Sequence, residues 1–231
     1  MQPIPIYIGY DPREAVAYHV CCQSILRYAS GPVAFIPLAL STLRGYYEQH
    51  TDGSNDFIYS RFLIPYLERW GQLHTHAIFM DGDMIVRDDI YKLWALRNPR
   101  TGVQVVKHDY KTKYAEKYLG AKNEDYPRKQ WSSVVVWNCN FYPNRILTPE
   151  FVHQQTGAYL HRFSWLKDEQ IGELPSSWNR LVLEQEVEKD DKLLHFTIGI
   201  PAFDEYRNCD KSEEWWQTLD CAMSPLKRGS F

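Results

Sequence analysis

The sequence lacks the features of disulfide-rich and membrane-spanning proteins. Only five of its 231 residues are cysteine, and no Cys-x-x-Cys pair occurs. This pattern indicates reduced thiols in a cytoplasmic setting, with no disulfide framework and no zinc site. No run approaches the roughly 18 apolar residues of a spanning helix, and the first residues, MQPIPIYIGY, do not resemble a secretory signal. Peripheral contact with a membrane stays open.

An excess of charge of one sign is also lacking. The formal net charge is -3 and no long basic stripe occurs, so we expect no nucleic acid partner. A negatively charged ligand would need a metal ion or a few well-placed cations. Aromatic residues are abundant at 15%, with eight Trp and sixteen Tyr. This is typical of a dense core or of surfaces that stack on sugar or base rings.

Apolar runs of strand length alternate with segments of helical spacing. Strands are expected at residues 4–9, 33–38, 76–80, 103–107, 133–138 and 192–196, and helices at 11–28, 60–70, 148–155 and 212–223, with a further helix after Asp88-Asp89 and with Ser212 as the N-cap of the last one. The order predicts an α/β protein with a mostly parallel central sheet flanked by helices. Pro37 favours an edge position for its strand. Ligands of such sheets bind beyond the carboxyl ends of the strands.

Asp81, Gly82 and Asp83 follow an apolar strand directly. Carboxylates two residues apart on an extended chain point to the same side, and glycine allows close approach of a ligand. A divalent cation held there could bridge two phosphates. The alternative is a plain β-turn, which Asp-Gly favours. The apolar residues on both sides support the metal site, because two buried carboxylates without a cation are costly.

His195 is the candidate third ligand, because it follows the strand-like run KLL. A lone histidine in such a place is more often structural. Gly199 follows closely, however, in a loop whose amides could contact phosphate. An imidazole ligand would favour Mn²⁺ over Mg²⁺.

Seven short motifs complete the pattern: IYIGYDPREAV, YSRFLIPYL, MDGDMIV, SSVVVWN, LKDEQIG, ELPSSWNRL and HFTIGIPAF. In order and spacing they resemble glycosyltransferase family 8, which includes glycogenin and bacterial lipopolysaccharide galactosyl- and glucosyltransferases. The resemblance covers about residues 5–203. It implies one GT-A domain over 1–231, with a nucleotide-binding half at 1–110 and a donor-sugar and acceptor half at 111–231. It also implies retaining transfer of a hexose from a nucleoside diphosphate sugar, by default a UDP-sugar, to a glycan or lipid-linked acceptor.

The resemblance also implies roles for individual residues. Nucleotide-sugar contacts would fall to Ile8, Gly9, Tyr10, Asp11, Arg61, Asp81, Gly82, Asp83, Ser132, Ser133 and Gly199, catalytic roles to Arg61, Asp168 and Glu169, and metal binding to Asp81, Asp83 and His195. Retention would follow either from a covalent intermediate on a carboxylate or from attack on the face that the leaving group departs. Glu169 suits the first route, and we favour the second.

Three departures from the family pattern bear on the site. Trp131-Ser132-Ser133 stands where Asn-Ala-Gly is usual, and Asp168-Glu169-Gln170 stands where Asp-Gln-Asp is usual. The closing motif has one extra residue between His195 and Gly199 and no lysine. Another cation must then contact the diphosphate. The candidates are Arg61 first, then Arg207 or Lys192.

The sequence also allows competing interpretations. The Asp-x-Asp pair could belong to a phosphatase with an aspartate nucleophile, or the chain could be a degenerate transferase that binds nucleotide-sugar or glycan without turnover. Asp168 and Glu169 could be a solvated helix start. Residues 109–129, rich in lysine and tyrosine, could be a flap over the substrates or an ordinary surface loop.

Overall fold

The computed structural model describes residues 2–51, 53–71 and 74–224, and its centre is a six-stranded sheet of order β2-β1-β3-β6-β5-β7. The strands are β1 (Ile4–Tyr10), β2 (Val33–Ala39), β3 (His76–Met80), β5 (Val103–Val105), β6 (Val134–Asn138) and β7 (Ile171–Glu173). Only β6 runs against the others, pairing antiparallel with both β3 and β5. The mostly parallel sheet is therefore confirmed, and β2 with its Pro37 lies at the edge as expected.

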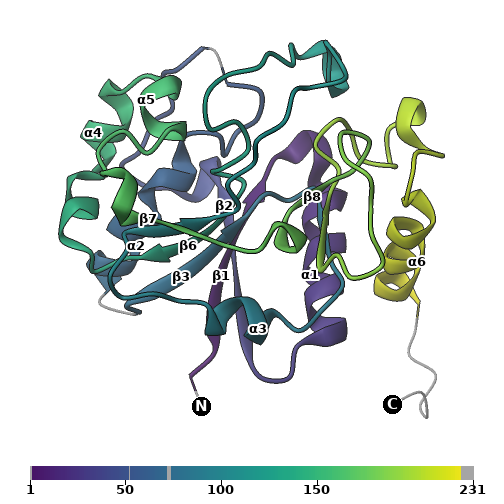
Figure 1. Cartoon of the computed structure of the whole chain (residues 1–231), viewed down its shortest axis with the longest axis horizontal. Coiled ribbons are helices and arrows are strands. Elements are labelled where there is room, and N and C mark those ends of the chain that lie inside the picture. The colour runs from purple at the N-terminus through teal and green to yellow at the C-terminus, as the bar shows by residue number, and fades with distance from the viewer. Residues whose placement is uncertain (1, 52, 72–73, 225–231) are drawn as a thin grey trace.

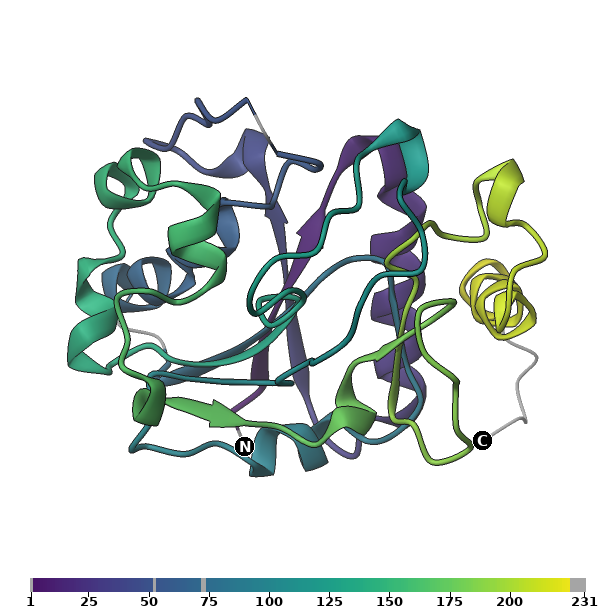
Figure 2. The ribbon, with the colours of Figure 1, turned by 45° about the horizontal axis from the view of Figure 1, so that its top comes forward.

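Helices cover both faces of this sheet (Figures 1 and 2). They are α1 (Ala15–Tyr28), α2 (Ile64–Gly71), α3 (Ile90–Ala95), α4 (Pro149–Gln154), α5 (Gly157–His161) and α6 (Ser212–Met223). Because strand side chains alternate between faces, Ile6 and Ile8 pack with the α1 residue Cys21, whereas Tyr7 packs with the α2 residue Ile64. α6 packs against the outer side of α1 through the buried Trp215.

A three-stranded sheet continues from the carboxyl end of β3. Its order is β4 (Met84–Val86), β9 (Leu193–His195) and β8 (Arg180–Leu181). Ile85 and Leu194 of this sheet pack in one cluster with Trp215, so the small sheet is fixed against α1 and α6. Residues 81–83 connect the two sheets, which places them between two rigid elements.

Some local expectations need correction. The first helix does not run unbroken from Asp11: a 3₁₀ turn, Pro12–Glu14, comes first and α1 begins at Ala15. Ser212 is the first residue of α6 and not its N-cap, because Lys211 takes the cap position with a left-handed φ of 60°. Thr148 and Asp89 do cap their helices, each accepting a hydrogen bond from a backbone N–H. Within the described ranges, no helix combines the length and apolar character that crossing a bilayer requires.

Candidate metal and nucleotide site

Asp81 is positioned by the antiparallel pairing of β3 with β6. Met80 lies opposite Val134, so the chain that enters β6 runs beside the chain that leaves β3. The Asp81 N–H donates to the carbonyl oxygen of Ser133 at 3.0 Å. This register explains why the two serines expected near the donor sugar, Ser132 and Ser133, adjoin the aspartate motif.

Gly82 allows the motif to pack directly against β1. A Cβ atom at this position would lie 2.5 Å from the carbonyl oxygen of Gly9, which is too close for any side chain. Gly9 is restricted as well, since a Cβ there would lie 2.4 Å from the Phe57 ring. The turn from Asp81 to Asp83 therefore depends on glycine for close backbone approach.

His195 reaches the acid pair through the β4–β9 pairing. It lies opposite Met84, and the Phe196 N–H donates to the Asp83 carbonyl oxygen at 2.9 Å. Its Nε2 lies 3.2 Å from Asp83 Oδ1 and 3.8 Å from Asp81 Oδ2. The three side chains offer ligand atoms within 4.8 Å of one another, and the three residues are buried.

Asn179 sets the orientation of the His195 ring. Its side-chain oxygen lies 3.0 Å from Nδ1 of His195, and its side-chain nitrogen donates to Ser133 Oγ at 2.8 Å. Because an amide oxygen only accepts, Nδ1 carries a ring proton, so a neutral ring would leave the Nε2 lone pair for a cation held by the aspartates. The buried Asp83 Oδ1 accepts no hydrogen bond within the described residues. Two carboxylates and an imidazole fit Mn²⁺, or Mg²⁺ with a weaker match.

Arg61, from the 3₁₀ turn before α2, forms an ion pair with Asp81. Its Nη1 lies 2.8 Å from Asp81 Oδ1 and donates to the Ser132 carbonyl oxygen at 3.0 Å. Burial raises the pKa of Asp81 to about 6, although Arg61 opposes the shift. Burial acts in the same direction on Asp83, but His195 and Lys117 together outweigh it and hold the pKa of Asp83 below its usual range.

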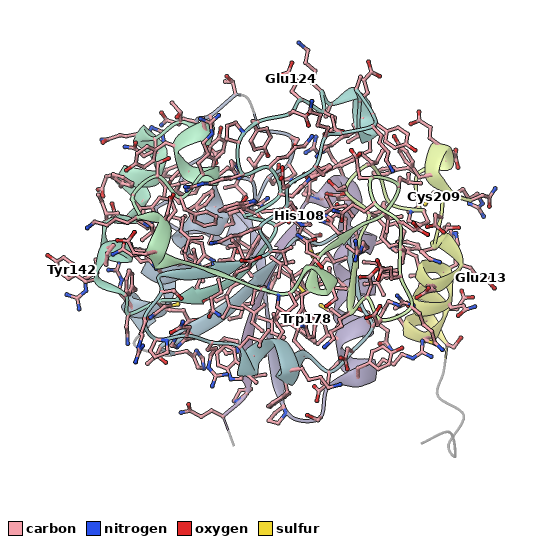
Figure 3. The ribbon with its side chains drawn as sticks, viewed as in Figure 1. His108, Glu124, Tyr142, Trp178, Cys209 and Glu213 are labelled. Carbon is pink, nitrogen blue, oxygen red and sulfur yellow. The ribbon has the colours of Figure 1, made fainter. Side chains whose placement is uncertain are left out.

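A narrow cavity of about 80 Å³ surrounds these groups. It is lined by Ser54, Asn55, Ile58, Arg61, Asp81, Asp83, Lys117, Tyr118, Tyr126, Gln130, Ser132, His161, His195 and Thr197. Three of these belong to residues 109–129, which we call the roof segment; it passes above the carboxyl end of β1 (Figure 1). In Figure 3, Glu124 of this segment lies at the outer edge and His108, just before it, near the middle of the view.

Lys117 is the cation that the sequence interpretation missed. It lines the cavity together with Asp81 and Asp83, and its Nζ lies 3.4 Å from Thr197 Oγ1. Burial lowers its pKa, and the two aspartates oppose that shift. The expected substitutes lie elsewhere. Arg207 covers the Trp216 ring, and the Lys192 ammonium is 3.5 Å from an Asp88 oxygen.

Most of the residues expected to contact the base or the phosphates of the nucleotide-sugar form contacts within the protein instead. Ile8 is fully buried in β1. The Asp11 carboxylate accepts hydrogen bonds from Arg13 and from the Asp56 N–H at 3.1 Å. Tyr10, which ends β1, packs edge-to-face with the Tyr18 ring. The Gly199 N–H donates to the Phe196 carbonyl oxygen, so it is used inside its own turn.

Asp168 and Glu169 lie apart from the cavity lining. They form a 3₁₀ turn before β7, and both are exposed. Asp168 pairs with Arg128 at 2.5 Å. Their catalytic role stays a prediction.

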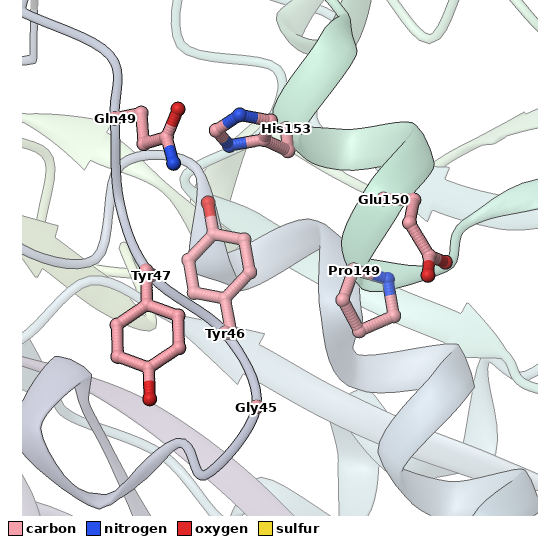
Figure 4. Close-up of a pocket in the computed structure, with 7 residues that line it drawn as sticks. All are labelled: Gly45, Tyr46, Tyr47, Gln49, Pro149, Glu150 and His153. Carbon is pink, nitrogen blue, oxygen red and sulfur yellow. The ribbon is translucent and has the colours of Figure 1, made fainter.

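A separate surface hollow of about 180 Å³ shares no residue with the metal cavity. Figure 4 shows its lining, with Tyr46, Tyr47 and Gln49 on one side and Glu150 and His153 of α4 on the other. It brings together no acid pair and histidine, so the metal chemistry belongs to the cavity at the end of β3.

The solved structures that this chain resembles include glycosyltransferases. Galactosyltransferase LgtC, solved with donor and acceptor sugar analogues, matches with a TM-score of 0.60 and 14% identity over 97% of this chain and 98% of that one. The bifunctional WbbM matches with a TM-score of 0.62, and GlyE of Streptococcus pneumoniae with 0.59, each at 14% identity over 94% of this chain. The chain spans 49% of WbbM and 60% of GlyE. These likenesses identify the fold as GT-A.

No family model matches the chain. Protein CDI of Arabidopsis thaliana, however, is 40% identical over 228 residues, which cover 95% of this chain and 87% of that protein. Identity of this extent over nearly the whole length shows common descent. The chain therefore belongs to the family of Protein CDI and has the GT-A fold of glycosyltransferases, with an Asp-x-Asp motif at the end of β3.

Proposed function

We propose that the protein is a metal-dependent, retaining glycosyltransferase that moves a hexose from a nucleoside diphosphate sugar, by expectation a UDP-sugar, to a hydroxyl group of a glycan or lipid-linked acceptor. One observation carries the proposal. A buried Asp81, Asp83 and His195 cluster, able to hold a divalent cation, lies beside two cations at the carboxyl end of β3 in a GT-A fold.

The charges that line the cavity support a diphosphate ligand. Arg61 and Lys117 balance Asp81 and Asp83. Glu14, which lies near the acid pair, adds no negative charge at neutral pH because burial, together with Asp83 and Asp11, raises its pKa to about 9. A divalent ion would therefore leave two positive charges in excess. This excess matches the two negative charges on the diphosphate of a nucleoside diphosphate sugar.

The residues of the site have separate roles in the proposed reaction. Asp81, Asp83 and His195 would hold Mn²⁺ or Mg²⁺, which as a bound Lewis acid stabilises negative charge on the leaving diphosphate. Arg61 and Lys117 donate hydrogen bonds and positive charge to the same leaving group, and this charge stabilisation is the largest contribution such a site offers. Asn179 keeps the proton on Nδ1 of His195.

The reaction transfers one glycosyl group. The acceptor oxygen bonds to C1 of the sugar while the bond from C1 to the phosphate oxygen breaks, and its electron pair leaves with the nucleoside diphosphate. The hydroxyl proton passes to that phosphate. Retention requires both events on one face of the sugar. We favour this route because Asp168 and Glu169, the carboxylates expected for a covalent intermediate, are exposed and do not line the cavity.

The remaining assignments rest on position. The end of β1 with Ile8, Gly9, Tyr10 and Asp11 would contact the base, as part of a nucleotide-binding half at 1–110. Ser132 and Ser133 would face the donor sugar, and 111–231 would contribute most of the acceptor contacts. Five cysteines without disulfides suit a cytoplasmic setting.

The test is donor turnover. Purified protein with Mn²⁺ is incubated with a panel of nucleotide-sugars, and nucleoside diphosphate release is measured by chromatography. We expect release from one donor, loss with EDTA, recovery with Mn²⁺, and loss in Asp83→Asn. The exposed Asp190→Asn is the matched control and should retain release.

Three outcomes would contradict the proposal. Phosphate release from simple phosphomonoesters without a sugar nucleotide would indicate the Asp-x-Asp phosphatase. Binding of UDP and Mn²⁺ without turnover on any donor and acceptor panel would indicate a degenerate binding protein. A melting temperature that UDP and Mn²⁺ leave unchanged, together with no release, would remove the metal–nucleotide site itself.

A further inference from the structure

A larger cavity opens beside the metal cavity, and we call it the side cavity. Its lining residues are Ile58, Tyr59, Lys122, Glu124, Tyr126, Gly157, Ala158, His161 and Arg162. Its volume is about 550 Å³, within the range of small-molecule sites. Ile58, Tyr126 and His161 line both cavities, so a ligand in the side cavity lies next to the groups around Asp81.

His161, the last residue of α5, lies at the junction. Its Nδ1 is 2.7 Å from Ser132 Oγ, which fixes the ring. Its Nε2 is buried and has no hydrogen-bond partner within the described residues. Burial lowers its pKa to about 3, so the ring is neutral at physiological pH. A neutral imidazole nitrogen can donate to a hydroxyl group or accept from it, depending on the tautomer, and an unsatisfied one favours a polar ligand.

The walls combine an exposed tyrosine ring with cations that form no salt bridge within the described part of the chain. Tyr59 is buried under a stacked His50 ring, so the exposed aromatic side chain is Tyr126 of the roof segment, which is 41% exposed. Neither Lys122 nor Arg162 forms a salt bridge to another described residue, and the buried Arg162 Nε has no hydrogen-bond partner there. Glu124 is the single carboxylate. Aromatic faces suit sugar rings, and an arginine fork suits a carboxylate or phosphate.

We propose that the side cavity binds the acceptor, a carbohydrate that carries an acidic group, and that His161 contacts its attacking hydroxyl group. The inference rests on the proposed function and names the substrate class at that site. The acidic group pairs with Arg162, the ring lies against Tyr126, and the hydroxyl hydrogen-bonds to Nε2 at the junction. His161 thereby places the hydroxyl beside the donor cavity.

The first test is binding without turnover. The labelled full chain, with UDP and Mn²⁺, is applied to an array of neutral glycans and of glycans bearing carboxylate, phosphate or sulfate. We expect binding confined to the acidic glycans. Arg162→Gln should weaken it about tenfold, which is the loss of one charge-assisted contact. Arg100→Gln, at an exposed arginine that lines neither cavity, should not weaken it. Binding to neutral glycans, equal binding by the two variants, or no binding would overturn the proposal.

The second test concerns His161 and uses a glycan selected on the array. In His161→Asn the amide can still reach Ser132 but cannot reach the hydroxyl. We expect KM for the acceptor to rise about ten times more than KM for the donor, and His161→Gln to recover part of the loss. A rise in the donor KM alone, or no change in either, would overturn the role of His161. If the unmodified protein turned over no donor, that result would instead contradict the proposed function. The array result would stand independently of it.

Discussion

The side-chain oxygen of Asn179 lies 3.0 Å from Nδ1 of His195 and determines which ring nitrogen faces the two aspartates. Replacing it with alanine removes the group that selects the tautomer. We expect Asn179→Ala to lower Mn²⁺ affinity by about 10- to 100-fold, the usual effect of losing such a partner. Titration of free Mn²⁺ by electron paramagnetic resonance measures this. Asn208→Ala, at an exposed position, is the control, and equal affinity in the two variants would contradict the assignment.

Arg61 neutralises a buried carboxylate whenever no metal is bound. Arg61→Met would leave Asp81 without its ion-pair partner at 2.8 Å. Because an unpaired buried charge is costly, we expect the free energy of unfolding to fall by about 3 kcal/mol in EDTA and to recover in part with Mn²⁺. Urea unfolding with and without Mn²⁺ tests this, with Arg100→Met as the control. A loss that Mn²⁺ does not reduce would indicate that Arg61 acts only in packing.

We expect Lys117 to contribute more to the affinity for the nucleoside diphosphate than to the stability of the fold. We expect Lys117→Met to weaken UDP binding in the presence of Mn²⁺ about tenfold, since one charge-assisted contact is lost. Lys117→Arg should retain most of the affinity. Isothermal titration calorimetry measures the change, and Lys113→Met, an exposed lysine of the same roof segment, is the matched control. Unchanged affinity in Lys117→Met would exclude contact with the diphosphate.

Glu14 gives a pH dependence with a definite sign. Its pKa is raised to about 9, first by burial and then by Asp83 and Asp11, so between its ordinary value and pH 9 the folded state holds a proton that the unfolded state has released. Stability from this group is therefore complete in acid and falls as pH rises.

Glu14→Gln removes that pH dependence and keeps a polar side chain next to the Tyr118 hydroxyl group. In EDTA we expect it to raise the free energy of unfolding by about 2 kcal/mol at pH 7.5 and to change it little at pH 4. Urea unfolding at the two pH values is the measurement, with the exposed Glu186→Gln as the control. Destabilisation at pH 7.5 would show that Glu14 is ionised in the folded protein.

Local signals predicted much of the fold. The apolar runs of β1, β2, β3 and β6 and the caps Thr148 and Asp89 are short-range features, and they lie where expected. The short strands β4, β7 and β8 were not predicted, whereas β5 and β9, of three residues each, were predicted because they lie in longer apolar runs. Ser212 failed as a cap because the turn before α6 depends on the conformation of Lys211.

The site also contains some residues that local sequence signals predicted and others that they did not. Asp81 and Asp83 belong to one contiguous motif, and the strand before them predicted their position. Lys117 reaches Thr197 across 80 positions of sequence, and His161 meets Ser132 across 29. No spacing rule connects residues that far apart. The lysine-rich composition of the roof segment was the only sequence signal for Lys117.

The roof segment has a consequence for turnover. A cavity of about 80 Å³ is far smaller than the roughly 300 Å³ at which small-molecule sites begin. Tyr118 is anchored by a stacked Phe203 ring and by donating its N–H to Ile198, while the Lys113 N–H donates to Glu184. A nucleotide that binds in this cavity as proposed would have to enter and leave after such contacts open. The catalytic cycle would then be paced by this opening rather than by bond breaking, and solvent viscosity would slow it.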